Sequence, residues 1–202
     1  MEITTLVGTF DSNTYIIVGG KGTLIVDCGA DIQALTKVLH KSPKPWTLLL
    51  THGHFDHMLN AAQLQRMGAK VYIHELDAER LTTNKNEGER KEFVVENCEV
   101  YETLRGDQTL DIAGYNIQVI HTPGHTEGSV CYLIEDKLFA GDTLFFEDYG
   151  RTDLYGGDFD KIKKTLYKLF ELDPSIVVYS GHYRTTTIAH ESKHNPIHTG
   201  KN

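Results

Sequence analysis

The distribution of apolar residues along the chain predicts strands and helices that alternate. β-Branched and aromatic runs are typical of short strands, and apolar residues three or four positions apart are typical of helices. The expected strands are residues 14–18, 23–26, 46–51, 70–73, 117–120, 129–134, 137–140 and 176–179. The expected helices are residues 32–39, 58–64, 159–170 and 185–194, and the polar residues 75–105 are expected to be helix and loop. This alternation predicts one α/β domain over residues 1–202, with helices outside the sheets.

Composition and charge narrow the class of protein. Hydrophobic residues make up 40% of the chain and charged residues 24%, which is ordinary for a folded globular domain. Lys and Arg number 20 against 28 Asp and Glu, a formal net charge of -8 that disfavours a nucleic-acid partner. The longest apolar run is only Val130 to Ile134, so no membrane span is expected.

Cysteine usage and the N-terminal residues indicate the compartment. Cys28, Cys98 and Cys131 are odd in number and have no CxxC spacing, so we expect free thiols in a reducing cytoplasm. Residues 1–5 have neither a basic flank nor an apolar stretch, and we therefore expect no secretory signal.

The strongest chemical signal is a histidine motif directly after the strand at residues 46–51. His52 and His54 lie two residues apart at the strand end, and Asp56 and His57 follow at the start of a helix. Imidazoles and a carboxylate suit zinc, iron or manganese. A polar loop that happens to be rich in histidine is the alternative interpretation of this segment alone.

Three more metal-ligand residue types follow other expected strands. His125 lies in Thr-Pro-Gly-His-Thr, Asp142 in Gly-Asp-Thr and His182 in Ser-Gly-His, each next to a glycine. Each alone is an ordinary turn residue. Together they indicate a metal site at one edge of a sheet, because glycine permits the sharp turns that direct side chains off strand ends.

This set of residues resembles the metallo-β-lactamase fold superfamily over nearly the whole chain. The resemblance implies an αββα four-layer sandwich, two mixed sheets with helices on the outer faces. It also implies two divalent metals, of which zinc is expected and iron or manganese are alternatives. By matching position, His52, His54, His125 and Asp142 would hold one metal, and Asp56, His57, His182 and the shared Asp142 would hold the second. Asp27 resembles the family's carboxylate that orients a metal ligand.

Within the superfamily, the motifs around His125, Asp142 and Gly150-Arg151-Thr152-Asp153 are most similar to hydroxyacylglutathione hydrolases, or glyoxalase II. The resemblance implies hydrolysis of a small-molecule thioester such as S-D-lactoylglutathione by a metal-bridging hydroxide, with Asp56 as a further proton acceptor. The alternatives are a mononuclear iron persulfide dioxygenase using His52, His125 and Asp142, and a lactonase or other ester hydrolase. Metallo-β-lactamases proper are disfavoured because they lack a bridging carboxylate such as Asp142.

Departures from the glyoxalase II pattern concern the substrate rather than the metals. Only 20 residues follow His182, so we expect no helical C-terminal domain that grips glutathione. Tyr183-Arg184 replaces the usual Gly-Pro, and Glu127 replaces a proline. We expect Arg151, Tyr183 and Arg184 to contact the substrate, in a monomer or small homo-oligomer.

Overall fold

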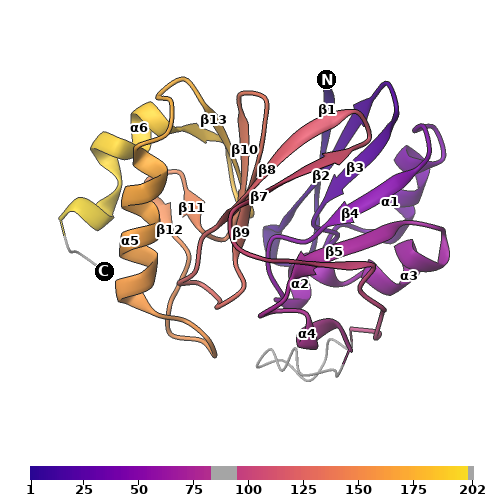
Figure 1. Ribbon diagram of the computed structural model, residues 1–202, viewed down its shortest axis with the longest axis horizontal. Coiled ribbons are helices and arrows are strands. Elements are labelled where there is room, and N and C mark those ends of the chain that lie inside the picture. Colours follow the sequence, from indigo (N-terminus) through magenta and orange to yellow (C-terminus); the bar gives the residue numbers. More distant parts are fainter. Residues whose placement is uncertain (83–94, 200–202) are drawn as a thin grey trace.

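The computed structural model describes residues 1–82 and 95–199, and two six-stranded sheets pack face to face in it (Figure 1). The first sheet has the order β1-β2-β3-β4-β5-β6. Its strands are β1 (Glu2–Val7), β2 (Asn13–Gly19), β3 (Gly22–Val26), β4 (Trp46–Leu49), β5 (Lys70–His74) and β6 (Glu102–Leu104). The first three strands are antiparallel neighbours, and β3 to β6 run parallel.

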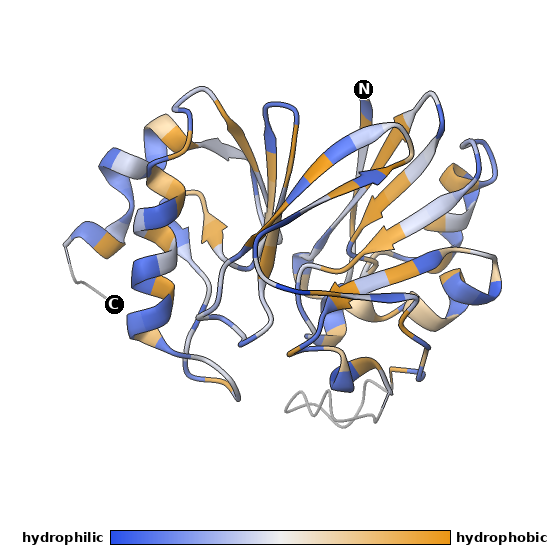
Figure 2. Ribbon diagram, viewed as in Figure 1, coloured by the Kyte–Doolittle hydropathy of each residue, from blue (hydrophilic) through white to orange (hydrophobic). Residues whose placement is uncertain are grey.

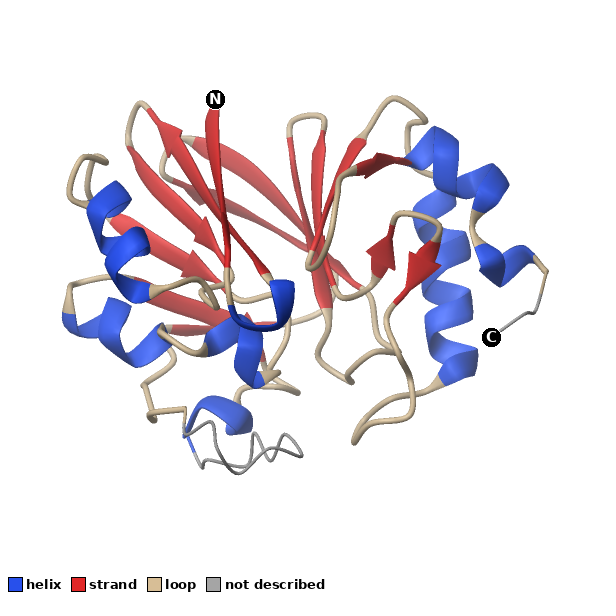
Figure 3. Ribbon diagram, turned by 180° about the vertical axis from the view of Figure 1, so that it is seen from behind, coloured by secondary structure: helices blue, strands red, loops and turns tan. Residues whose placement is uncertain are grey.

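The second sheet comes from the C-terminal half and has the order β14-β13-β10-β9-β8-β7. Its strands are β7 (Gln108–Ile112), β8 (Tyr115–His121), β9 (Val130–Ile134), β10 (Lys137–Gly141), β13 (Val177–Ser180) and β14 (Thr186–Thr187). Only β10 and β13 are parallel neighbours. A hairpin of β11 (Leu144–Phe145) and β12 (Asp148–Tyr149) lies beside the helix α5 (Phe159–Phe170) (Figure 3).

Helices cover the outer faces of both sheets. On the first sheet these are α1 (Ile32–Leu39), α2 (Phe55–Met58), α3 (Ala61–Arg66) and α4 (Glu79–Thr82), and on the second α5 (Phe159–Phe170) and α6 (Ile188–His194). Short 3₁₀ turns span Thr9–Asp11 and Pro196–His198. In the described part of the chain, no helix is long and apolar enough to cross a membrane.

Apolar side chains form three layers, as a four-layer sandwich requires. One layer lies between the first sheet and its helices, one between the two sheets, and one between the second sheet and α5 and α6. Leu35, Tyr132 and Leu166 are fully buried examples from the three layers. Figure 2 shows apolar residues along the strands and both polar and apolar residues on α5. The expected αββα architecture is confirmed.

Most expected elements are present, and three of the missed strands have a common cause. β1, β6 and β7 are partly exposed and short or at a sheet edge, so they lack a continuous apolar run. Strand β6 lies in the segment 75–105 expected to be helix and loop, of which residues 83–94 lie outside the described residues. Helix caps followed the sequence, since Asp31 and Asp158 both accept from backbone N–H groups of the first turn.

Two expected helices are wrong in extent. The helix expected over 58–64 is divided into α2 and α3 at Asn60, whose side chain donates to the carbonyls of Cys28 and Ala30 instead. The helix expected over 185–194 begins only at Ile188, because the residues before it form strand β14 beside β13. Tertiary hydrogen bonding overrides local helix propensity at both places.

Candidate metal centre

The seven histidines and aspartates of the expected site follow strand ends or begin a short helix. His52 and His54 follow β4, and α2 carries Asp56 and His57. The remaining three residues come from the second sheet: His125 from the loop between β8 and β9, Asp142 after β10, and His182 after β13. Both sheets therefore contribute to one cluster.

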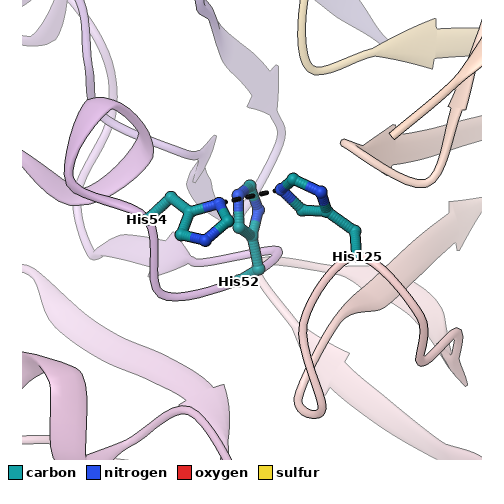
Figure 4. Close-up of side chains that lie close together, drawn as sticks. All are labelled: His52, His54 and His125. Atoms are coloured by element: carbon teal, nitrogen blue, oxygen red, sulfur yellow. Dashed lines mark hydrogen bonds between the residues drawn. The ribbon is translucent and has the colours of Figure 1, made fainter. Parts of the chain in front are cut away.

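His52, His54 and His125 form one group, called here the three-histidine group (Figure 4). Their candidate ligand atoms lie within 4.8 Å of one another. His125 Nε2 is 2.8 Å from His54 Nδ1. Burial lowers the pKa of His54 to about 3 and lowers the pKa of the other two as well. All three imidazoles are therefore neutral at pH 7, the form that binds a metal.

Asp56, His57 and His182 form the second group, called the carboxylate group. His182 Nε2 is 3.4 Å from Asp56 Oδ2 and 3.2 Å from His57 Nε2. Burial opposes protonation of both histidines, but neighbouring carboxylates outweigh it and raise the pKa of His57 and, to about 9, that of His182.

Asp142 lies between the two groups. Its carboxylate oxygens are 3.2 Å from His57 Nε2, 3.4 Å from His182 Nε2 and 3.5 Å from His125 Nε2. The backbone at Gly181 approaches closely, since a Cβ there would lie 2.2 Å from Asp142 Oδ1. Glycine at this position thus allows the strand carrying His182 to reach Asp142.

Hydrogen bonds from Nδ1 orient three of the histidines. His57 Nδ1 donates to Asp27 Oδ2 at 2.8 Å, His125 Nδ1 to the carbonyl of Arg151 at 2.8 Å, and His182 Nδ1 to the carbonyl of Phe10 at 3.0 Å. A neutral imidazole that donates from Nδ1 presents the Nε2 lone pair, which here faces the centre of the cluster.

Asp27 also organises the chain around the cluster. It accepts from the backbone N–H of Thr51 at 2.8 Å and from its hydroxyl, next to His52. Asp27 adopts a left-handed conformation, with a φ of 57°. Such a conformation is unusual for a residue with a side chain, and surrounding contacts must hold it in place.

The cluster fits a metal on a test that is independent of the resemblance. Among the described residues, His52 Nε2 and Asp142 Oδ1 are buried without a hydrogen-bond partner. Unpartnered buried polar atoms are rare and costly, and a coordinated cation would satisfy both. The histidine and aspartate cluster suits a dinuclear metal site.

The expected substrate residues lie around this cluster in different settings. Arg151 forms a two-point ion pair with Asp153, with distances of 2.7 and 2.8 Å, while its carbonyl binds His125. Tyr183 is 69% exposed, and its ring centroid lies 5.9 Å from that of His182. The guanidinium of Arg184 lies 3.5 Å from the centroid of Phe146. The structure thus places Tyr183 beside the metal residues and gives both arginines partners within the chain.

Sequence reasoning missed the contribution of the backbone at Phe10. Phe10 and Asp11 both have a positive φ, of 55° and 61°, in the loop between β1 and β2. This loop brings the carbonyl of Phe10 to His182 and the hydroxyl of Ser12 to the carbonyl of Asp56 at 2.9 Å. A carbonyl is present in every residue, so no sequence signal marks it.

A family model for the metallo-β-lactamase superfamily matches residues 7–182, which include all seven cluster residues. The chain belongs to this superfamily. It is 38% identical to an uncharacterized protein of Mycobacterium leprae (strain TN), over 96% of each chain. It is 31% identical to the hydroxyacylglutathione hydrolase GloC of Haemophilus influenzae, over 90% of this chain and 89% of the relative.

Solved structures agree on the fold and differ in their names. The B3 metallo-β-lactamase BLEG-1 matches with a TM-score of 0.91 and 32% identity, over 98% of this chain and all of the other. TTHA1623 in a di-iron-bound form matches with a TM-score of 0.85 and 30% identity, over 97% of this chain and 99% of the other. ETHE1 from Myxococcus xanthus matches with a TM-score of 0.83 and 25% identity, over all of this chain and 86% of the other. The fold and the superfamily are therefore shown, whereas the names of the matching proteins point to several activities.

Proposed function

We propose that this protein is a glyoxalase II-like hydrolase that cleaves S-D-lactoylglutathione or a related thioester into an acid and a thiol. The proposal is carried by the position of Asp142. Its carboxylate lies within 3.5 Å of histidines of both groups and so joins them into one site. The 31% identity to the hydroxyacylglutathione hydrolase of Haemophilus influenzae supports the substrate class.

The proposed cofactors are two divalent ions, with zinc as our choice and iron or manganese as the alternatives. The three-histidine group with Asp142 would hold one ion, and the carboxylate group with Asp142 the other. When bound, such ions lower the pKa of water toward neutrality and polarise a carbonyl, so hydrolysis needs no protein nucleophile.

Asp56 is the chain's own candidate for handling a proton. Burial raises its pKa, but His57 and His182 outweigh burial, and the net direction is downward. Asp56 is therefore a carboxylate at pH 7. Its Oδ2 lies 3.4 Å from His182 Nε2 and is the atom that accepts a proton.

Arg151, Tyr183 and Arg184 are proposed to bind the substrate. The chain has a net charge of -8, so an anionic thioester needs a local cation near the site. Arg151 is tied to the centre through His125, and its pair with Asp153 is exposed on both sides. An exposed ion pair contributes little stability, and a substrate carboxylate can therefore replace Asp153.

The second candidate function is a mononuclear iron persulfide dioxygenase that uses His52, His125 and Asp142. The Gly150-Arg151-Thr152-Asp153 motif favours it, and two histidines with one carboxylate are a donor set for iron oxygenases. Lactonase, other ester hydrolase and β-lactamase activities are further outcomes of the test, the last because of the similarity to BLEG-1.

One set of assays separates these functions. The protein purified after growth with zinc, iron and manganese is analysed for metals and assayed with S-D-lactoylglutathione, a lactone, a β-lactam and glutathione persulfide with an oxygen electrode. We expect two metals per chain, thioester hydrolysis and no oxygen uptake. One iron per chain with oxygen uptake would establish the dioxygenase, and turnover of only the lactone or the β-lactam would replace the thioester as substrate.

We further propose that the protein acts on a small molecule in the cytoplasm as a monomer or small homo-oligomer, without nucleic acid or a membrane. The cysteines support the compartment, because Cys28, Cys98 and Cys131 are buried free thiols, a state typical of reducing compartments.

A further inference from the structure

Asp77 is a buried carboxylate that lies outside the cluster of metal residues. It follows β5, and its relative exposure is only 1%. The residue belongs to the polar segment 75–105, in which the sequence showed no motif. A buried carboxylate needs partners, and those of Asp77 lie on the two loops of the three-histidine group.

Two of these partners flank the metal residues directly. The backbone N–H of Gly53, between His52 and His54, donates to Asp77 Oδ2 at 2.8 Å. The hydroxyl of Thr126, next to His125, donates to the same oxygen at 2.8 Å. The first loop belongs to the first sheet and the second to the other sheet, so this oxygen joins the two halves of the molecule at the metal centre.

The other oxygen of Asp77 strengthens the same connection. Oδ1 accepts from the backbone N–H of Gly128 at 3.0 Å, on the His125 loop, and Arg80 Nε lies 3.9 Å away from it. A Cβ at Gly128 would lie 2.7 Å from Asp77 Cγ, so the loop and the carboxylate are in close contact. Only an ionised carboxylate accepts all three bonds, because an amide presents a donor on one side.

We propose that Asp77 is a positioning residue that holds the His52–His54 loop against the His125 loop and so sets the spacing of the three-histidine group. The inference rests on the proposed metal centre. On the other side of β4, Asp27 accepts from His57 of the carboxylate group and also from Thr51, whose hydroxyl lies 3.0 Å from His52 Nδ1. Asp77 differs from Asp27 in that the hydrogen bonds it accepts come from the two loops of the three-histidine group.

The test isolates the three-histidine group. His182→Ala removes a ligand of the carboxylate group and leaves the three-histidine group intact, and Asp77→Asn is then added to this variant. Zinc affinity is measured by competition with a chelator, and the visible spectrum of the cobalt-loaded protein reports ligand geometry. We expect Asp77→Asn to weaken zinc binding about 10- to 100-fold, the range for outer ligand-orienting residues, and to change the cobalt spectrum.

Matched variants separate positioning from folding. Asp111→Asn makes the same chemical change on an exposed residue of β7 and should leave zinc affinity unchanged. Thr126→Val removes one of the three bonds and should weaken zinc binding in the same direction by less. Near-ultraviolet circular dichroism of the metal-free variants checks the fold. If Asp77→Asn is unfolded, the zinc affinity of Thr126→Val tests the role of Asp77.

The outcomes distinguish this inference from the proposed function. If the wild-type protein binds no zinc, the proposed metal centre is wrong and the inference falls with it. If the wild type binds two zinc ions but Asp77→Asn and Thr126→Val keep full affinity and an unchanged cobalt spectrum, only the role of Asp77 is overturned.

Discussion

The two halves of the candidate metal centre differ in their electrostatics although they share Asp142. The three-histidine group has no acidic member, and burial keeps its imidazoles neutral. The carboxylate group has Asp56 within it and Asp27 behind it, and the pKa values of His57 and His182 are raised. Without metal, the first group is therefore neutral and already deprotonated, whereas the second is an ion-paired cluster that holds protons.

This difference indicates how each half is stabilised without metal. In the carboxylate group, protonated histidines neutralise the buried carboxylates. The imidazoles of the three-histidine group carry no such charge. Within the described residues, His52 Nε2 also has no hydrogen-bond partner. We infer that a bound metal supplies the missing partner of His52 in the three-histidine group. In the carboxylate group, the metal replaces protons held by the histidines.

Asp142→Ala is expected to have the largest effect because Asp142 contacts both groups. Its removal should reduce thioester hydrolysis by more than about 100-fold, the upper range for residues that only orient ligands. Steady-state kinetics with metal analysis measures the change. Asp136→Ala, on an exposed residue beside Lys137, is the control that should retain full activity. Equal activity of the two variants would remove Asp142 from the centre.

Replacing one histidine in each group should separate the halves. His54→Ala is expected to lose metal from the three-histidine group, and His182→Ala from the carboxylate group, so each variant should bind one metal instead of two. Stoichiometry after dialysis against zinc measures this. Two metals in either variant would mean that the groups are assigned wrongly.

Arg151→Ala should affect substrate binding and leave both halves loaded with metal. Loss of a charged hydrogen-bonded pair is expected to raise KM for S-D-lactoylglutathione about 10- to 100-fold at similar kcat. The control Asp153→Ala removes the competing carboxylate and should lower KM. An unchanged KM with lost metal would show that Arg151 is structural, acting through its carbonyl bond to His125.

An effect of similar size is expected in the pH dependence of metal binding. His182 has a pKa of about 9 in the metal-free protein, because hydrogen bonds to Asp142 and Asp56 outweigh burial. It holds a proton at pH 7, and metal must displace it. The proton on His182 should therefore make zinc affinity of the carboxylate group rise by about tenfold per pH unit below pH 9, and the proton on His57, whose pKa is also raised, should add to this rise.

Measurement of protons released on zinc binding checks this prediction. His54→Ala, which retains the carboxylate group, should release protons at pH 7. His182→Ala, which retains the three-histidine group, should release fewer, since the pKa of His54 is about 3. Equal release from both variants would contradict the electrostatic difference between the halves.

Local sequence was sufficient where one segment carries the whole signal. Helix α5 follows from an apolar stripe with Asp158 at its start, and the His52 to His57 motif follows from ligand types at one strand end. Local sequence was not sufficient where a partner distant in the chain decides the conformation. Asn60 interrupts a helix because Cys28 and Ala30 offer carbonyls, and the edge strands β1 and β7 form by pairing rather than by an apolar pattern.

The sequence by itself determined which side chains are able to bind metal, since that depends on residue type and on the glycine turns beside them. The tertiary structure decided their protonation and orientation. Protonation depends on burial and neighbouring charges, which act through space. Orientation depends on hydrogen bonds that backbone carbonyls accept from His125 and His182 and that Asp77 accepts from the two ligand loops, and no sequence motif marks these partners. Packing two sheets face to face brings these groups within hydrogen-bonding distance, and only there do their interactions exist.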